Sequence, residues 1–461
     1  MSDMLKLLPS VDALLSSITS EYKHEIVRNR CRQVLESMRA ALLDGSLQPG
    51  SKKQALDIAA DLVYKRLHQD FSPSIRSVIN ATGIILHTGL GRAPLSPAAQ
   101  ENLGLIMQGY SSLELDLDSG KRGERTDHIR RLLCELTGAE DALLVNNNAA
   151  AVFLALNTLS FGQEAIISRG QLVEIGGSFR MPDVMEKSGV IMREVGSTNK
   201  TKLSDYEKAI NENTGVIVVV HTSNYRVLGF TAQVELKELC DLAHAHNLPV
   251  LHDLGAGVIV DFKKLGLPHE PLVQDSIGAG ADVITFSGDK VLGGPQSGLI
   301  VGKTAWLQKI HANPIMRAVR CDKLIYAAIE ETLKLYAREK FLRHHTVLQM
   351  MTESIENIQQ RAQKILNGLP ASLKKQYGIE IKESESQFGS GALPLEKLTS
   401  CALTLAPPHQ SAESLSRKLR IGEPPIIGRI QGDKVWLDVR TIFDNQVDKV
   451  IQRLQTINEQ E

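Results

Sequence analysis

A lysine in a glycine-rich turn is the residue of this 461-residue chain that is best placed for chemistry. Lys290 lies in ADVITFSGDKVLGGPQSGLIVG, between two apolar runs, 281–287 and 297–302, that have the β-branched content of buried strands. A rigid, partly desolvated lysine has an accessible neutral amine near pH 7, and that amine can form a Schiff base with pyridoxal phosphate. The neighbouring glycines, such as Gly293 and Gly294, are expected to leave room for a flat ring and its phosphate. A solvated turn lysine would have the same pattern, so the turn alone leaves both interpretations open.

An aspartate at the end of the preceding strand unit favours the cofactor. Asp253 ends the apolar run of LPVLHDLGAG. A carboxylate there can pair with a protonated pyridinium nitrogen and keep the ring an electron sink. An aspartate that caps the next turn would look the same. Its place one strand before Lys290 makes the pair more informative than either residue.

A third feature, ALLVNNNAAAVFLAL, passes from a strand through three asparagines into a helix. The backbone N–H groups of a helix start bind anions, so Asn147, Asn148 and Ala149 are candidate cofactor-phosphate ligands, and Ser287 can add a hydroxyl. An Asx turn with an ordinary N-cap would have the same sequence. The chain order of anion site, aspartate, serine and lysine matches the fold type I enzymes that use pyridoxal phosphate.

Composition describes an ordinary globular protein, with 43% hydrophobic and 23% charged residues. The formal net charge of -1 argues against binding to DNA, and any basic surface has to be local. The five cysteines are scattered without CxxC spacing, which argues against a disulfide framework or a metal site and favours a reducing compartment. No signal peptide and no run of about 18 apolar residues is present, so we expect a cytoplasmic protein without a membrane span.

The elements that position these residues change character along the chain. Residues 1–72 have helical periodicity and predict a small separate domain, with ten Lys/Arg against nine acidic residues. Residues 73–330 alternate short apolar strands with helices, which predicts an α/β large domain with a mainly parallel sheet. Residues 331–461 predict a smaller α+β domain. Ligands of such parallel sheets gather at the carboxyl ends of the strands.

Longer motifs resemble the bacterial L-seryl-tRNA(Sec) selenium transferases, or selenocysteine synthases, over essentially the whole chain. The similar segments are NATGIILHTGLGRAPLS (80–96), LELDLDSGKRGERTDH (113–128), SRGQLVEIGGSFRMPDV (168–184), HDLGAG (252–257), FSGDKVLGGPQSG (286–298) and PPIIGRI. The resemblance implies a fold type I transferase in which serine esterified to tRNA(Sec) forms an aldimine with pyridoxal phosphate. Loss of the hydroxyl then gives an aminoacrylyl-tRNA, to which selenium from selenophosphate adds.

The family pattern also implies roles for single residues. Lys290 would shuttle protons, with Asp289 helping to handle protons or to hold the lysine. Selenophosphate would bind Arg92, Arg317 and Arg320, because forked guanidinium groups suit small anions. On a helix, Arg317 and Arg320 would face the same way. Taken alone, each arginine could equally be a surface ion-pair partner.

Other implications leave alternatives open. The N-terminal domain would recognise tRNA through Arg28, Arg30, Arg32 and Arg39, although a solvated face or an oligomer contact has the same composition. Glu174 could lie near the cofactor ring. Arg429 sits where relatives bind a substrate carboxylate, but here that carboxylate is esterified, so it is not a site candidate. A homo-oligomer, as a ring of dimers, is expected by analogy. A pyridoxal phosphate lyase on a free amino acid or amino sugar acid, and a non-catalytic tRNA-binding protein, are the alternatives.

Overall fold

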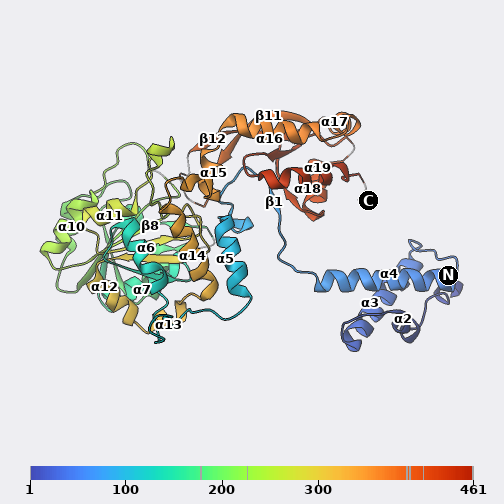
Figure 1. The fold of residues 1–461 in the computed structure, drawn as a ribbon, viewed down its shortest axis with the longest axis horizontal. Helices are drawn as coiled ribbons and strands as arrows, with labels where there is room; N and C mark the ends of the chain where they lie inside the picture. Colours follow the sequence, from blue (N-terminus) through green and yellow to red (C-terminus); the bar gives the residue numbers. More distant parts are fainter. Residues whose placement is uncertain are drawn as a thin grey trace. The chain divides into compact units, whose positions relative to one another are not determined.

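The chain folds as two compact units, Met1–Ser77 and Val78–Glu461 (Figure 1). The computed structural model describes residues 2–176, 179–225, 227–390, 393, 396–408 and 410–458. The sequence-based division into 1–72, 73–330 and 331–461 places its second boundary inside the larger unit, and the two parts of that unit are described in turn.

The N-terminal unit is helical, as its periodicity predicts. Its helices are α1 (Ser2–Leu5), α2 (Val11–Ser17), α3 (His24–Leu43) and α4 (Lys52–Phe71). Apolar residues three and four apart on α3 and α4, among them Cys31, Met38 and Val63, are buried in a core of their own. Ser51 caps α4 by accepting a hydrogen bond from the backbone N–H of Gln54.

The larger unit is built on a seven-stranded sheet with the order β2-β10-β9-β8-β7-β3-β6. Its strands are β2 (Asp141–Val145), β3 (Glu164–Ser168), β6 (Ile191–Val195), β7 (Thr214–Val220), β8 (Val250–Gly255), β9 (Val283–Ser287) and β10 (Gly298–Gly302). Each coincides with one of the apolar runs that predict a strand. Only β10 runs antiparallel to its neighbours, so the predicted mainly parallel α/β sheet is confirmed.

Helices cover both faces of this sheet (Figure 1). One face packs against α6 (Asp127–Thr137), α10 (Leu236–Ala245), α11 (Val273–Ala279) and α14 (Lys323–Tyr336). The other packs against α7 (Asn148–Ser160), α8 (Met181–Lys187) and α12 (Thr304–Ala312). Around them lie α5 (Pro97–Met107), α9 (Leu203–Ala209), α13 (Ile315–Val319) and the hairpin of β4 (Glu174–Ile175) and β5 (Phe179–Arg180). The carboxyl ends of the six parallel strands therefore share one edge of the sheet.

The C-terminal part has the expected α+β character. Its four-stranded sheet has the order β11-β12-β15-β14, with β11 (Glu380–Gln387), β12 (Lys397–Leu405), β15 (Lys434–Asp438) and β14 (Arg429–Gln431). The helices are α15 (Thr346–Thr352), α16 (Ile355–Asn367), α17 (Ala371–Gln376), α18 (Ala412–Ile421) and α19 (Val447–Gln455). Two segments cross the boundaries expected from sequence. β1 (Ile79–Asn80) pairs with β13 (Ile426–Ile427), and α14 continues past residue 331 while packing on the large sheet.

No helix in the described part of the chain is long and apolar enough to cross a membrane.

Candidate active site

Lys290 lies in the turn that follows β9 at the carboxyl edge of the sheet, and only 5% of its surface is exposed. Backbone hydrogen bonds close the turn: the N–H of Gly288 donates to the Ser297 carbonyl at 2.9 Å, and that of Gly294 donates to the Gly288 carbonyl at 2.8 Å. Burial lowers the pKa of Lys290, against the opposing attraction of the Asp253 carboxylate. The neutral, nucleophilic amine is therefore accessible at a lower pH than in a solvated lysine.

Two glycines of this turn lie where a side chain would collide with neighbouring residues. A Cβ atom on Gly288 would lie 2.1 Å from Ser297 Oγ, and one on Gly293 would lie 2.4 Å from a ring carbon of His345. These glycines let the turn pack closely against the protein, and the expectation that they also leave room for a ring stays a prediction. On β8, a Cβ added to Gly255 would stand 3.8 Å from Lys290 Nζ.

Asp253 lies one strand away in β8 and is 3% exposed. Its Oδ1 accepts hydrogen bonds from Asn148 Nδ2 at 2.8 Å and from Thr285 Oγ1 at 3.0 Å. Burial raises the pKa of Asp253, while these two hydrogen bonds and the nearby Lys290 ammonium act in the opposite direction. A cation brought to this carboxylate would stabilise its ionised form.

The expected anion site lies at the start of α7, where the side chains of Asn147 and Asn148 are engaged in hydrogen bonds. Asn147 is the N-cap, and its Oδ1 accepts from the N–H of Ala150 at 2.9 Å. Asn148 binds Asp253. The N–H groups of Asn148 and Ala149 begin the helix and so have no partner within it, which leaves backbone donors for an anion. The buried Ser287 ends β9, the strand that leads into the Lys290 turn.

Arg92 reaches the lysine turn from a distant part of the sequence. Its Nη1 lies 2.6 Å from Asp289 Oδ2, and the N–H of Ala93 donates to the Asp289 carbonyl at 3.3 Å. Arg92 has a φ of 61°, in the left-handed region that costs a non-glycine residue energy. The pair places a guanidinium and a carboxylate directly beside Lys290, and the charges of both act on the pKa of the lysine.

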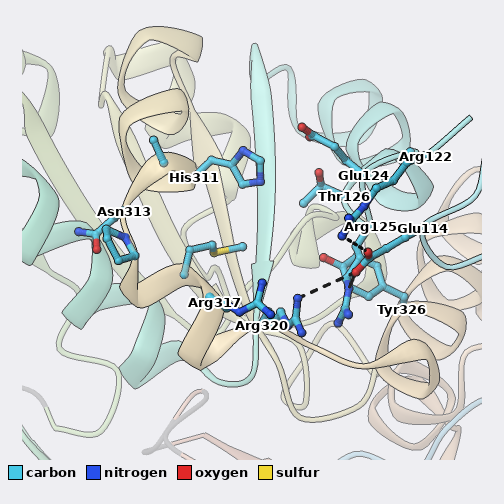
Figure 2. A pocket seen from close by; sticks show the side chains of 14 residues that line it. Glu114, Arg122, Glu124, Arg125, Thr126, His311, Asn313, Arg317, Arg320 and Tyr326 are labelled. Atoms are coloured by element: carbon cyan, nitrogen blue, oxygen red, sulfur yellow. Dashed lines mark hydrogen bonds and ion pairs between the residues drawn. The ribbon is translucent and has the colours of Figure 1, made fainter.

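Arg317 and Arg320 lie together at a different place. They line a pocket of about 380 Å³ (Figure 2), and Arg92 is not among its lining residues. Arg317 belongs to α13, whereas Arg320 follows that helix in extended conformation and its backbone bridges to Val145 at the end of β2. The expectation that both arginines lie on one face of a helix is therefore wrong, because only Arg317 belongs to the helix. The pocket still adjoins the carboxyl edge of the sheet, because Val145 directly precedes the asparagine run.

The same pocket contains charged residues that the sequence analysis did not single out. Glu114 forms ion pairs with Arg122 and Arg125, each at 2.7 Å. All three come from the motif 113–128, which was recognised only as part of a family pattern. Clustered charges in RGER were the available signal, but pairing between residues of one loop cannot be read from spacing.

Glu174 and Arg429 make contacts that serve the fold. Glu174 is exposed in β4, and its Oε2 accepts from Arg180 Nε at 2.8 Å; Gly177 and Ser178, in the same family motif, lie outside the described residues. Arg429 donates to Ser384 Oγ at 2.7 Å and lies 3.5 Å from the fully buried carboxylate of Asp438. These contacts join strands of the C-terminal sheet.

Two of the four N-terminal arginines are engaged within their own unit. Arg28 lies 3.4 Å from Asp12, and Arg30 forms an ion pair with Asp70. Arg32 and Arg39 are exposed on α3, and their side chains form no hydrogen bond or ion pair with a described residue. They are seven residues apart and so lie on one face of the helix.

The residues at the carboxyl edge fit pyridoxal phosphate. A buried amine with a lowered pKa can bond its aldehyde carbon, and a buried carboxylate can meet its ring nitrogen. The side chain of Asn148 adds an orphaned acceptor, since its buried Oδ1 has no hydrogen-bond partner in the described structure. Among the described residues, no group of three or more His, Cys, Asp or Glu could hold a metal ion.

Comparisons with known proteins find similar chains over almost the whole length. Residues 78–443 match the family model of L-seryl-tRNA selenium transferase. An L-seryl-tRNA(Sec) selenium transferase of Carboxydothermus hydrogenoformans is 46% identical over 450 residues, covering 96% of this chain and 96% of that protein. That of Alkaliphilus metalliredigens is 45% identical, covering 98% of each chain.

A solved structure supports the fold. The structure of D-glucosaminate-6-phosphate ammonia-lyase superposes with a TM-score of 0.58 at 20% identity, covering 85% of this chain and 98% of the other. The expected fold type I architecture is confirmed.

Proposed function

Because the chain belongs to the L-seryl-tRNA selenium transferase family, we propose that it converts seryl-tRNA(Sec) to selenocysteinyl-tRNA(Sec) with selenophosphate as selenium donor. The observation that carries this is the buried pair of Lys290 and Asp253 at the carboxyl edge of the sheet. Replacing the serine hydroxyl needs a base at Cα and a sink for the resulting negative charge, and these two residues are placed to provide the first and support the second.

The overall exchange balances without an oxidant or reductant. The serine Cβ–O bond breaks, and the hydroxyl group takes up a proton and leaves as water. A Cβ–Se bond then forms while the P–Se bond of selenophosphate is cleaved by water, which releases phosphate. Selenium enters and leaves the transfer at the same oxidation level.

Pyridoxal phosphate is the cofactor that the site fits, and it supplies an electron sink that stabilises negative charge at Cα. Lys290 would bond its aldehyde carbon, Asp253 would pair with its ring nitrogen, and the N–H groups of Asn148 and Ala149 at the start of α7 would hold its phosphate. Asn147, the N-cap of the helix, would support that site, and the buried Ser287 would add a hydroxyl to it.

Lys290 is the proton carrier of the proposed reaction. Its neutral amine accepts the proton from the serine Cα, and the resulting ammonium can donate a proton to the departing hydroxyl. Asp289 fixes Arg92 beside the amine through the 2.6 Å ion pair. The positive charge of Arg92 lowers the pKa of Lys290 and so favours the neutral form that accepts the proton.

Arg317 and Arg320 are proposed to bind selenophosphate, since two guanidinium groups lining one pocket suit a small tetrahedral anion. The positive charge of Arg92 would attract the same anion beside Lys290. The exposed Arg32 and Arg39 of the helical unit are proposed to contact tRNA phosphates. A homo-oligomer built as a ring of dimers, and a reducing cytoplasmic setting in which the five cysteines stay free, complete the proposal.

An assay with three acceptors tests this function. The purified protein is supplied with selenophosphate and with seryl-tRNA(Sec), seryl-tRNA(Ser) or free serine, and selenocysteine is measured by mass spectrometry after ester hydrolysis. We expect product only from seryl-tRNA(Sec). Product from free serine would favour a lyase or transferase for small substrates, and tRNA binding without product would indicate a non-catalytic protein.

A further inference from the structure

We propose that Glu114 is a resident carboxylate that competes with phosphate-type anions for the arginines of the Arg317/Arg320 pocket (Figure 2). The inference rests on the proposed function, which assigns this pocket to selenophosphate. It adds a regulating residue to that site: Glu114 sets which anions stay in the pocket and how readily phosphate leaves it.

Glu114 stands where an anionic ligand would be expected to stand. Its Oε1 lies 2.7 Å from Arg125 Nε and 4.0 Å from Arg320 Nη1, and its Oε2 lies 2.7 Å from Arg122 Nη2. Figure 2 shows the carboxylate pointing toward these guanidinium groups inside the pocket. A carboxylate with one guanidinium on each oxygen and another nearby makes the contacts that a phosphate group makes with arginines.

The three arginines are held to different degrees. Arg125 is 20% exposed in its side chain and also donates to the Cys321 carbonyl, so it is fixed. Arg122 is 80% exposed, and an ion pair so open to solvent contributes little. Arg320 reaches Glu114 only at the 4.0 Å limit of an ion pair. Arg320 can therefore turn to another anion without losing a close hydrogen bond.

Arg317 completes the pocket as an uncommitted cation. Its side chain forms no hydrogen bond or ion pair with any residue that the structure describes. In this pocket Arg317 therefore has no ion-pair partner among the described residues, and Arg320 has only a distant one. Arg122 and Arg125 form close ion pairs with Glu114. Hydrogen bonds from Arg125 and then Arg122 hold the pKa of Glu114 below its usual value, so its negative charge is present at neutral pH.

The charge of Glu114 has a predictable effect on binding. It offsets one of the positive charges in the pocket, so an incoming anion meets repulsion from the carboxylate as well as attraction from the arginines. A weakly matched anion is disfavoured, whereas one that engages both Arg317 and Arg320 can offset that repulsion. After transfer, the same carboxylate favours the departure of phosphate.

Binding of inorganic phosphate to the enzyme loaded with pyridoxal phosphate tests this, because the cofactor phosphate site is then filled. Isothermal titration calorimetry should give a dissociation constant about tenfold lower for Glu114→Gln than for wild type. Asp118→Asn is the matched control. It removes the same charge from an exposed position of the same loop, whose side chain forms no hydrogen bond or ion pair with a described residue, and it should bind like wild type. Arg317→Ala should abolish the binding.

A second variant distinguishes an effect of the Glu114 charge from a folding defect. Glu114→Asp keeps the charge but withdraws the carboxylate by one methylene, so phosphate affinity should lie between those of wild type and Glu114→Gln. Unchanged or weaker phosphate binding in both variants would overturn the proposal. So would a change in tRNA affinity without a change in phosphate affinity, which would assign the pocket to a backbone phosphate.

The phosphate measurement does not depend on turnover. If the selenium transferase assay fails while phosphate binding still tightens in Glu114→Gln, the proposed function is wrong and the competition stands. With turnover intact, Glu114→Gln should also show stronger inhibition by added phosphate, which a purely structural residue would not cause.

Discussion

The guanidinium of Arg92 lies 2.6 Å from the carboxylate of Asp289, the residue that precedes the buried Lys290. This ion pair links the segment between β1 and α5 to the lysine turn between β9 and β10. Arg92 is not among the residues that line the pocket of Arg317 and Arg320. The three arginines that the family pattern groups together therefore occupy two places in the structure.

Arg92→Ala should move the pH dependence of the lysine. The Arg92 charge lowers the pKa of Lys290 and the Asp289 charge raises it, so removing Arg92 raises the pKa. At a given pH less of the amine is then neutral, and the acidic limb for pyridoxal phosphate binding shifts to higher pH. The rate of binding to the apoprotein, followed by absorbance between pH 6 and 9, measures this. An unshifted limb, or one shifted to lower pH, would contradict the assignment, and Arg317→Ala serves as the control that should leave it in place.

Asp253→Asn should separate cofactor binding from catalysis. The amide keeps an acceptor for Asn148 and Thr285 but loses the negative charge that holds a proton on the ring nitrogen. Turnover should fall by about 10²-fold or more while pyridoxal phosphate still binds. Single-turnover kinetics and the visible spectrum of the same sample report the two effects. Near wild-type turnover would remove Asp253 from the site.

Most of the large domain is predictable because its strands are local features. Each strand of the central sheet is a short apolar run bounded by turn residues, so it can be predicted without knowledge of the neighbouring strands. The antiparallel direction of β10 could not be predicted in this way, because a buried apolar run has the same composition whichever way the strand runs. Pairing of β1 with β13 joins distant segments of the chain, and no local pattern encodes it.

The site was predictable to the extent that its residues lie at or just after the carboxyl ends of strands. Asp253, Ser287 and Lys290 lie at one edge because parallel strands end there. The contacts of Asn148 were not predictable, since an asparagine at a helix start can cap the helix or reach across to another strand. Glu114 was missed for a similar reason, because its partners are chosen by the path of a loop and by Arg320 from far along the chain.

Arg317→Ala should weaken selenophosphate binding specifically. The exposed Arg317 side chain forms no hydrogen bond or ion pair with a described residue, so its loss should not disturb the fold. Loss of a charge-assisted hydrogen bond to an anion should raise KM for selenophosphate by about 10- to 100-fold. Steady-state kinetics at saturating seryl-tRNA(Sec) measure it, and Arg131→Ala, exposed on α6, is a matched control. An unchanged KM would exclude Arg317 from the selenophosphate site.

Removing residues 1–77 should abolish tRNA binding and leave the cofactor bound. The helical unit has its own core, so the remaining unit is expected to keep its fold. A filter-binding assay with tRNA(Sec) and the visible spectrum report the two properties. Within the full chain, Arg32→Ala with Arg39→Ala should weaken tRNA binding and reduce its salt dependence, whereas Arg28→Ala, at a position already paired with Asp12, should do so less. Unchanged affinity in the truncated protein would place tRNA recognition in the larger unit.

The most direct test of the account is where pyridoxal phosphate is attached. The loaded enzyme is reduced with borohydride, digested and analysed by mass spectrometry, with Lys290→Ala treated in parallel. We predict that the reduced cofactor is found on the peptide containing Lys290, and that the variant retains no reducible attachment. Attachment to another lysine, or a reducible cofactor in Lys290→Ala, would contradict the central assignment.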